Sequence, residues 1–179
     1  LPLLRWLSRR SLWALHVLGT GLGWAGYLLS PAYRRRFEAN AARAGVSKAE
    51  RRAAIGEAGR MATETPKLWL RAADAPLAPA AQWIDAERVE AALDAGRGLV
   101  VLTPHLGSFE VVAQAYAERF GARVPMTALY RPAKQAWLRE LETTARSRPG
   151  LLTAPASLAG VRQMIRALRQ GQTVGLLPD

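Results

Sequence analysis

The chain has 179 residues, and its 25 Lys and Arg against 14 Asp and Glu give a net charge of +11. This length is enough for a domain with a sizeable core, and the positive charge favours anionic partners. Because there is no cysteine, a disulfide framework, a thiolate nucleophile and Cys-ligated zinc are excluded, and with two histidines we expect no metal site.

Residues 12–30 contain no Lys, Arg, Asp or Glu. As a helix rising ~1.5 Å per residue they nearly span a bilayer core. Arginines 5, 9 and 10 precede this segment and arginines 34–36 follow it, and Trp and Tyr side chains lie near both ends. We therefore expect residues 1–36 to be an N-terminal membrane anchor, either a single span, an interfacial helix or an uncleaved signal anchor. Charge on both sides leaves its orientation open.

Residues 37–97 are predicted to form a helical scaffold. Ser47 and Glu50 have the spacing of a capping box, which predicts a helix that runs until Pro66 interrupts it. A loop over residues 72–81, rich in Pro and Ala, leads to a short helix over 86–95, with Asp85 as its N-cap.

From residue 98 onward, apolar runs alternate with helical segments. Strands are predicted over 99–103, 124–130, near 151 and over 173–177, and helices over 108–120, 133–146 and 157–169. Near-continuous apolar strands separated by helices indicate an α/β fold with a mainly parallel sheet flanked by helices. Since the chain stops at residue 179 directly after the last strand, we expect this α/β core, residues 98–179, to be incomplete.

His105 and Glu110 are the most informative residues of the chain. His105 follows an apolar strand, and four residues separate it from Glu110. One of these four is Gly107, which allows a tight turn between the histidine and the carboxylate. A neutral imidazole can accept a proton from a hydroxyl, and a carboxylate can orient the ring and stabilise the imidazolium that forms. No serine or cysteine nucleophile accompanies them, which indicates a hydroxyl supplied by the substrate.

Two more predicted strands end in similar polar residues, Arg131 before Pro132 and Asp179 after Pro178. In open parallel sheets the ligand crevice lies outside the carboxyl ends of the strands, so His105, Arg131 and Asp179 are expected to face one cavity. Each has a plainer explanation as well. His105 and Arg131 also suit ordinary loop positions, and Asp179 also suits the cap of a following helix.

The predicted helix over 157–169 is amphipathic. Arg162, Arg166 and Arg169 are spaced on one face, opposite Val161, Ile165 and Leu168. The basic face is either an ordinary solvated surface or a docking surface for an acidic carrier protein or phosphates. Lys134 and Arg139 are candidates to extend it.

The block from His105 to Glu110, with Leu129-Tyr-Arg-Pro and Gly175-Leu-Leu-Pro-Asp, resembles the lipid A biosynthesis acyltransferases. These are the lauroyl and myristoyl transferases of Gram-negative inner membranes, within the glycerolipid acyltransferase-like superfamily. The likeness covers most of the chain, including the N-terminal anchor, the Arg cluster after it and the segment Pro66-Lys-Leu-Trp-Leu.

The resemblance implies transfer of an acyl chain from an acyl carrier protein thioester to a hydroxyl of a lipid A precursor of the Kdo-lipid IVA type, with no cofactor. It makes His105 the general base and Glu110 its orienter. By the same resemblance Arg131 and Asp179 are expected to bind the substrate. Gly107 and Ser108, which lie between the histidine and the carboxylate, are further substrate-binding candidates, and Lys134, Arg162, Arg166 and Arg169 are the candidates from the basic surface for docking the carrier. The expected location is the bacterial cell inner membrane, with the catalytic domain on the cytoplasmic side.

Other functions fit parts of the same pattern. Related acyltransferases that act on glycerophospholipids, ornithine lipids or phosphatidylinositol mannosides share the His-x4-acid unit. A non-catalytic, basic membrane-surface module would use the arginines without His105. A nucleic-acid partner is not expected, since the Arg excess lacks an interleaved aromatic platform or a reading motif.

Overall fold

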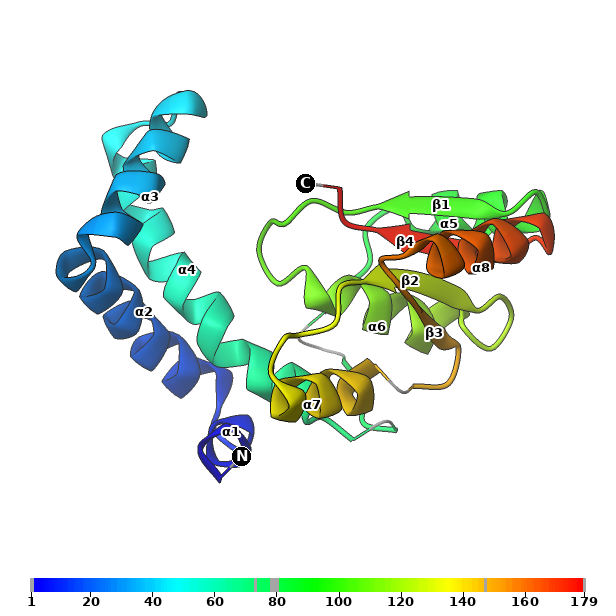
Figure 1. The fold of residues 1–179 in the computed structure, drawn as a ribbon, viewed down its shortest axis with the longest axis horizontal. Coiled ribbons are helices and arrows are strands. Elements are labelled where there is room, and N and C mark those ends of the chain that lie inside the picture. The colour runs from blue at the N-terminus through cyan, green and yellow to red at the C-terminus, as the bar shows by residue number, and fades with distance from the viewer. Residues whose placement is uncertain (1, 73, 78–80, 147, 179) are drawn as a thin grey trace. The chain divides into compact units, whose positions relative to one another are not determined.

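The computed structural model describes residues 2–72, 74–77, 81–146 and 148–178. Two compact units divide the chain, Leu1–Leu70 and Arg71–Asp179. The first is helical and the second is α/β (Figure 1). The helices are α1 (Pro2–Ser8), α2 (Leu12–Leu29), α3 (Pro31–Arg43), α4 (Lys48–Trp69), α5 (Ala86–Asp94), α6 (Glu110–Phe120), α7 (Ala136–Arg146) and α8 (Leu158–Arg169). The strands are β1 (Leu99–Leu102), β2 (Met126–Tyr130), β3 (Leu151–Pro155) and β4 (Thr173–Leu176).

The long helices of the first unit begin at side-chain caps. The Ser11 hydroxyl accepts from Ala14 N at the start of α2, and Ser30 caps α3 in the same way through Tyr33 N. The capping box of α4 is confirmed, since Ser47 Oγ accepts from Glu50 N while Glu50 accepts from Ser47 N. Among the described residues, α2 is the one helix long and apolar enough to cross a membrane.

α2 and α4 pack side by side through glycines (Figure 1). A Cβ added to Gly59 of α4 would collide with the carbonyl oxygen of Gly19 in α2, so the two backbones are in direct contact. Thr63 reinforces the contact, because its hydroxyl donates to Leu15 O at 2.7 Å. Gly19 and Gly23, a small-xxx-small pair of the kind seen in helix dimers, thus serve packing within one chain.

The prediction that Pro66 ends the second long helix is wrong. α4 continues to Trp69, and Leu70 N donates to Pro66 O at 3.0 Å. Proline removes only its own N–H bond, so the residues after it can still complete the final helical turn. Asp85 occupies the N-cap position of α5 as predicted, but its side chain makes no capping hydrogen bond. Asp85 has a left-handed backbone (φ 55°), and its carboxylate pairs with Arg88 at 3.3 Å.

The second unit confirms the α/β prediction with a four-stranded parallel sheet in the order β1-β4-β2-β3. Each predicted strand and helix of this part is present within a few residues of its expected limits. Of the predicted loop over 72–81, residues 73 and 78–80 lie outside the described part of the chain.

The strand order places helices on both faces of the sheet. The connection from β1 to β2 and that from β3 to β4 cross the sheet in opposite directions, so right-handed crossovers put α6 and α8 on opposite faces. One core accordingly joins α5 and α6 to the sheet and includes Tyr116, Phe120 and Met126, while the other joins α8 through Met164 and Ala167.

Tyr116 ties α6 to the sheet. Its hydroxyl lies 2.7 Å from Thr173 Oγ1 at the start of β4 and donates to Val124 O at 3.1 Å. Burial raises the pKa of Tyr116, so the phenol stays neutral and keeps its proton for these bonds.

The predicted placement of the arginines of the helix over 157–169 on the face opposite Val161 and Ile165 needs correction. Met164 and Ala167 are buried against the sheet, whereas Val161 and Ile165 are 44% and 45% exposed. The tight crossing of Gly160 over Pro155 O sets this rotation, since a Cβ at Gly160 would overlap that carbonyl. The outer surface of α8 therefore carries Leu158, Val161 and Ile165 beside the arginines.

The glycine contact between α2 and α4 predicts a large difference between two conservative substitutions. Gly59→Ala should destabilise the helical unit by about 1–3 kcal/mol, because its methyl group has no space against α2. Gly21→Ala, where a Cβ meets nothing within 4 Å, should be neutral or stabilising by up to about 1 kcal/mol. Equilibrium urea unfolding followed by circular dichroism measures both, and equal stabilities would contradict the close approach.

Candidate active site

The carboxyl ends of three neighbouring strands meet at one edge of the sheet. β4 lies between β1 and β2, so the segments that follow these strands emerge side by side. The hydrogen bonding between β1 and β4 continues one residue beyond the end of β1, since Thr103 N donates to Leu176 O at 3.0 Å. The predicted convergence of these strand ends is confirmed for β1, β2 and β4.

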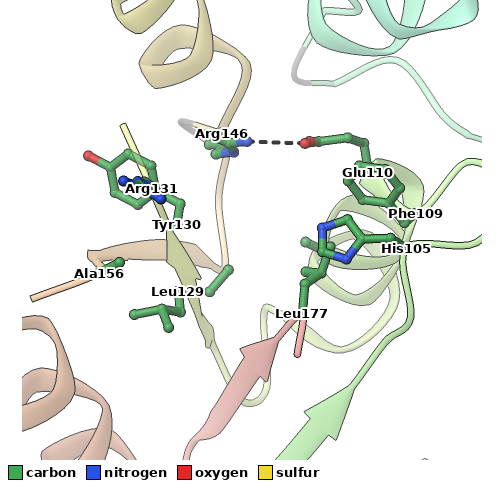
Figure 2. A pocket seen from close by; sticks show the side chains of 11 residues that line it. His105, Phe109, Glu110, Leu129, Tyr130, Arg131, Arg146, Ala156 and Leu177 are labelled. Atoms are coloured by element: carbon green, nitrogen blue, oxygen red, sulfur yellow. Dashed lines mark hydrogen bonds and ion pairs between the residues drawn. The ribbon is translucent and has the colours of Figure 1, made fainter. Parts of the chain in front are cut away.

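A cavity of about 440 Å³ opens at this edge (Figure 2). It is lined by His105, Phe109, Glu110, Ala113, Ala128, Leu129, Tyr130, Arg131, Arg146, Ala156 and Leu177. His105 and Glu110 come from the loop and helix after β1, and Tyr130 and Arg131 come from the end of β2, on the other side of the cavity (Figure 2). Three of the predicted site residues, His105, Glu110 and Arg131, therefore line one space.

The loop after β1 brings His105 and Glu110 to the cavity. Gly107 has φ +57°, a conformation that L side chains rarely adopt, so the turn between the two residues depends on glycine. Glu110 is the first residue of α6, and the His105 ring contacts the Phe109 ring edge-on, with centroids 5.0 Å apart. Glu110 thus lies at the N-terminus of α6, where the helix dipole interacts favourably with a carboxylate.

Arg146, the last residue of α7, is the cation that faces Glu110. Its Nη2 lies 3.1 Å from Glu110 Oε1, and the two side chains are only 19% and 20% exposed. Its guanidinium carbon lies 5.4 Å from the centre of the Tyr130 ring, a cation–π contact. Arg146 thus connects the Glu110 side of the cavity to the β2 side (Figure 2).

Glu142, one turn before Arg146, contacts both Arg146 and the loop after β2. Its Oε2 accepts from Ala133 N at 3.1 Å, just after the Tyr-Arg-Pro segment, and lies 3.8 Å from Arg146 Nη1. Through these two side chains α7 connects the start of α6 to the loop that carries Arg131. The charges of Glu110, Arg146 and Glu142 alternate, which stabilises all three in a partly buried place.

Arg148 fixes the backbone that follows α7. It donates to Arg71 O at 2.8 Å and to Ala72 O at 3.1 Å, and it is buried. Burial, and next the nearby charge of Arg71, lower the pKa of Arg148, because both disfavour a second positive charge there. Its hydrogen bonds to carbonyl groups compensate part of this cost and anchor the segment next to Arg146.

The remaining predicted site residues lie elsewhere. Ser108 and Lys134 are exposed, and neither they nor Gly107 line the cavity. Arg162, Arg166 and Arg169 lie on the outer surface of α8, and the described residues offer none of them an ion-pair partner. Asp179 lies outside the described residues, although Leu177, two residues earlier, lines the cavity.

Sequence reasoning missed Arg146, Glu142 and Tyr130. Glu142 and Arg146 are four residues apart in a predicted helix, a pattern that solvated helices often show. Only the position of α7 reveals that this pair faces Glu110 and the end of β2.

Comparison with known proteins agrees with this geometry. A model of the family described as "Bacterial lipid A biosynthesis acyltransferase" matches residues 14–179, nearly the whole chain and all of the cavity. No curated protein sequence matches at a significant level. The extent of the family match makes the protein an acyltransferase, and the chain belongs to the bacterial lipid A biosynthesis acyltransferase family.

Proposed function

We propose that this acyltransferase moves a fatty acyl chain from an acyl carrier protein thioester to a hydroxyl of a lipid A precursor. The observation that carries the proposal is the cavity that places a histidine, a carboxylate and an arginine at one sheet edge. Membership of the family supports the lipid A-type acceptor, of which the Kdo-lipid IVA type is our specific candidate.

In the proposed reaction His105 is the general base. One imidazole nitrogen takes the proton of the acceptor hydroxyl as its oxygen attacks the thioester carbonyl. Glu110 orients the ring and stabilises the imidazolium. The ion pair with Arg146 uses only Oε1 of Glu110. The second carboxylate oxygen can therefore accept a hydrogen bond from the imidazole.

Attack on the thioester produces a tetrahedral intermediate with a negative oxygen. Arg131, across the cavity from His105, is the candidate for stabilising that charge or for holding a phosphate of the acceptor. The C–S bond then breaks, the carbonyl reforms as an ester, and the imidazolium returns its proton to the departing carrier thiolate. No group beyond the two substrates is needed to balance this step.

We assign Arg146 a positioning role. It fixes the Glu110 side chain through the ion pair, and it is itself held by Tyr130 and Glu142. Removing one partner of a partly buried pair leaves the other charge uncompensated, so loss of Arg146 would let the Glu110 side chain move toward water.

The carrier is proposed to dock on α8. Ser157 caps this helix at the edge of the sheet where the cavity opens, and Arg162, Arg166 and Arg169 follow along its exposed face. These arginines have no ion-pair partner among the described residues, and they lie beside exposed apolar side chains, a combination that suits an acidic amphipathic protein. Lys134, close in sequence to Arg131, is a candidate to join the contact.

Alternative acceptors of the same chemistry are glycerophospholipids, ornithine lipids and phosphatidylinositol mannosides. Full-length protein in detergent, given acyl carrier thioesters and each acceptor in turn, should acylate the lipid A precursor fastest, as measured by mass spectrometry of the products. Faster acylation of another lipid would show that the lipid A precursor is not the preferred acceptor. If no lipid were acylated, the proposed transfer would be overturned.

The proposed base and its orienter predict loss of chemistry without loss of structure. His105→Ala and Glu110→Gln should each lower kcat by about 10²–10⁴-fold, the usual contribution of a general base. Binding to membranes should not change. Arg119→Ala, on the exposed side of α6, is the matched control and should retain activity. Full turnover in purified His105→Ala would refute the mechanism.

The ion pair between Arg146 and Glu110 predicts a graded response. Arg146→Gln should lower kcat by up to about 10²-fold with little change in KM, because a misplaced catalytic group mainly affects the transition state. Arg146→Lys keeps the charge and should recover part of the loss. Steady-state kinetics with both substrates measure the effects on kcat and on KM separately. A change confined to KM would instead make Arg146 a binding residue.

Docking on α8 predicts a defect that depends on the carrier. Replacing Arg162 and Arg166 together by Glu should raise KM for the acyl carrier thioester by about tenfold or more, since charge reversal weakens encounter with an acidic partner. Turnover of a carrier-free acyl-pantetheine thioester should not change. Arg119→Glu, which reverses a single exposed charge on α6, is the control for charge reversal away from α8. Equal loss with both donors would contradict a docking role.

A further inference from the structure

The outer face of α2 is apolar and exposed. Its exposed side chains are Leu12, Trp13, Val17, Leu18, Leu22, Leu28 and Leu29. The buried side of the helix has the small residues Gly19 and Gly23 with Leu15. An apolar strip this long, with Trp13 76% exposed, marks a membrane or protein interaction surface.

The opposite flank of α2 contacts charged side chains along most of its length. His16 Nε2 lies 3.0 Å from Glu64 Oε2, and Arg60 Nε donates to Thr20 Oγ1 at 2.9 Å. Tyr27 donates to Glu38 Oε1 of α3 at 2.6 Å. His16, Thr20 and Tyr27 are spaced so that they lie along one side of the helix.

The carboxylate of Glu38 is firmly ionised. The hydrogen bond from Tyr27, and next that from Arg51 at 3.2 Å, lower the pKa of Glu38. α4 brings further charges along α2, among them Glu57, which pairs with Arg60. α2 is therefore part of a helix pair with one apolar side and one charged side.

This pairing disfavours α2 as a transmembrane span. If α2 crossed the bilayer, its middle would carry Arg60 and Glu64 of α4 into the hydrocarbon with it, because the two helices are in backbone contact. Charged side chains at the bilayer centre are costly. If α2 instead lies in the membrane plane, its apolar side enters the lipid and the charged side of the pair stays in water.

The arginines at the two ends of α2 give an independent argument. Arg5, Arg9 and Arg10 precede the helix and Arg34, Arg35 and Arg36 follow it, all of them exposed. A spanning helix would place one of these basic clusters on the far side, against the preference for basic residues on the cytoplasmic side. An in-plane helix places both clusters at the head groups of a single anionic leaflet.

We propose that residues 2–70 form an in-plane anchor, in which α2 lies in one anionic leaflet with its outer face among the acyl chains and α4 above it in water. The inference rests on the membrane anchor expected from the sequence and not on acyl transfer. It explains why a helix that is apolar enough to span also carries polar contacts along one flank.

Single-cysteine labelling decides the topology directly, since the chain has no cysteine of its own. Arg9→Cys and Arg35→Cys place one thiol at each end of α2, at exposed positions. With full-length protein in sealed right-side-out and inside-out vesicles, an impermeant maleimide should label both variants from the cytoplasmic side only. Labelling of the two ends from opposite sides would overturn the proposal.

Vesicle binding tests the outer face. Leu22→Glu should weaken co-sedimentation with vesicles containing anionic phosphatidylglycerol by about tenfold or more, because it removes buried apolar area and adds repulsion. Ile84→Glu, at an exposed position in the α/β unit, is the matched control and should bind as the unchanged protein does. Equal binding of both variants would contradict the proposed face. Neither assay measures transfer, so an inactive enzyme that labels as expected would leave this anchor standing.

Discussion

The parallel pairing of β4 between β1 and β2 is the constraint on which the α/β unit depends. It brings together strand ends that are far apart in sequence, those before His105, Arg131 and Leu177. It also makes the crossovers run in opposite directions, so both faces of the sheet are covered. The side chains at the cavity thus lie on these strands, on the loops that directly follow them or on the neighbouring helices.

The cavity is completed by α7, which packs mainly outside the sheet core. Glu142 and Arg146, one turn apart, connect the loop after β2 to the first residue of α6. In the role that we propose for Glu110 its carboxylate needs a fixed direction, and the partly buried Arg146 supplies it. The ion pair therefore links the position of α7 to the orientation of Glu110.

The helical unit follows a different constraint, which is the backbone contact between Gly19 and Gly59. Close approach forces α4, with its charged side chains, to lie along α2. Transferring one charged side chain to the bilayer centre costs about 2.5–3.5 kcal/mol on insertion scales, which offsets the gain from inserting an apolar helix. In the in-plane anchor that we propose, packing, more than hydropathy, determines how this helix meets a membrane.

The sequence by itself determined the α/β class, the limits of most elements and the residues His105, Glu110 and Arg131, because apolar periodicity and strand ends are local properties. It also predicted the family through its motifs. Arg146 and Glu142, the exposure of Val161 and Ile165, and the partners of α2 were decided only by tertiary structure. These features depend on contacts between elements that are distant in sequence. A helical ion pair, an apolar helix face or a glycine has the same local sequence pattern whatever it contacts, so the sequence could not predict the partner.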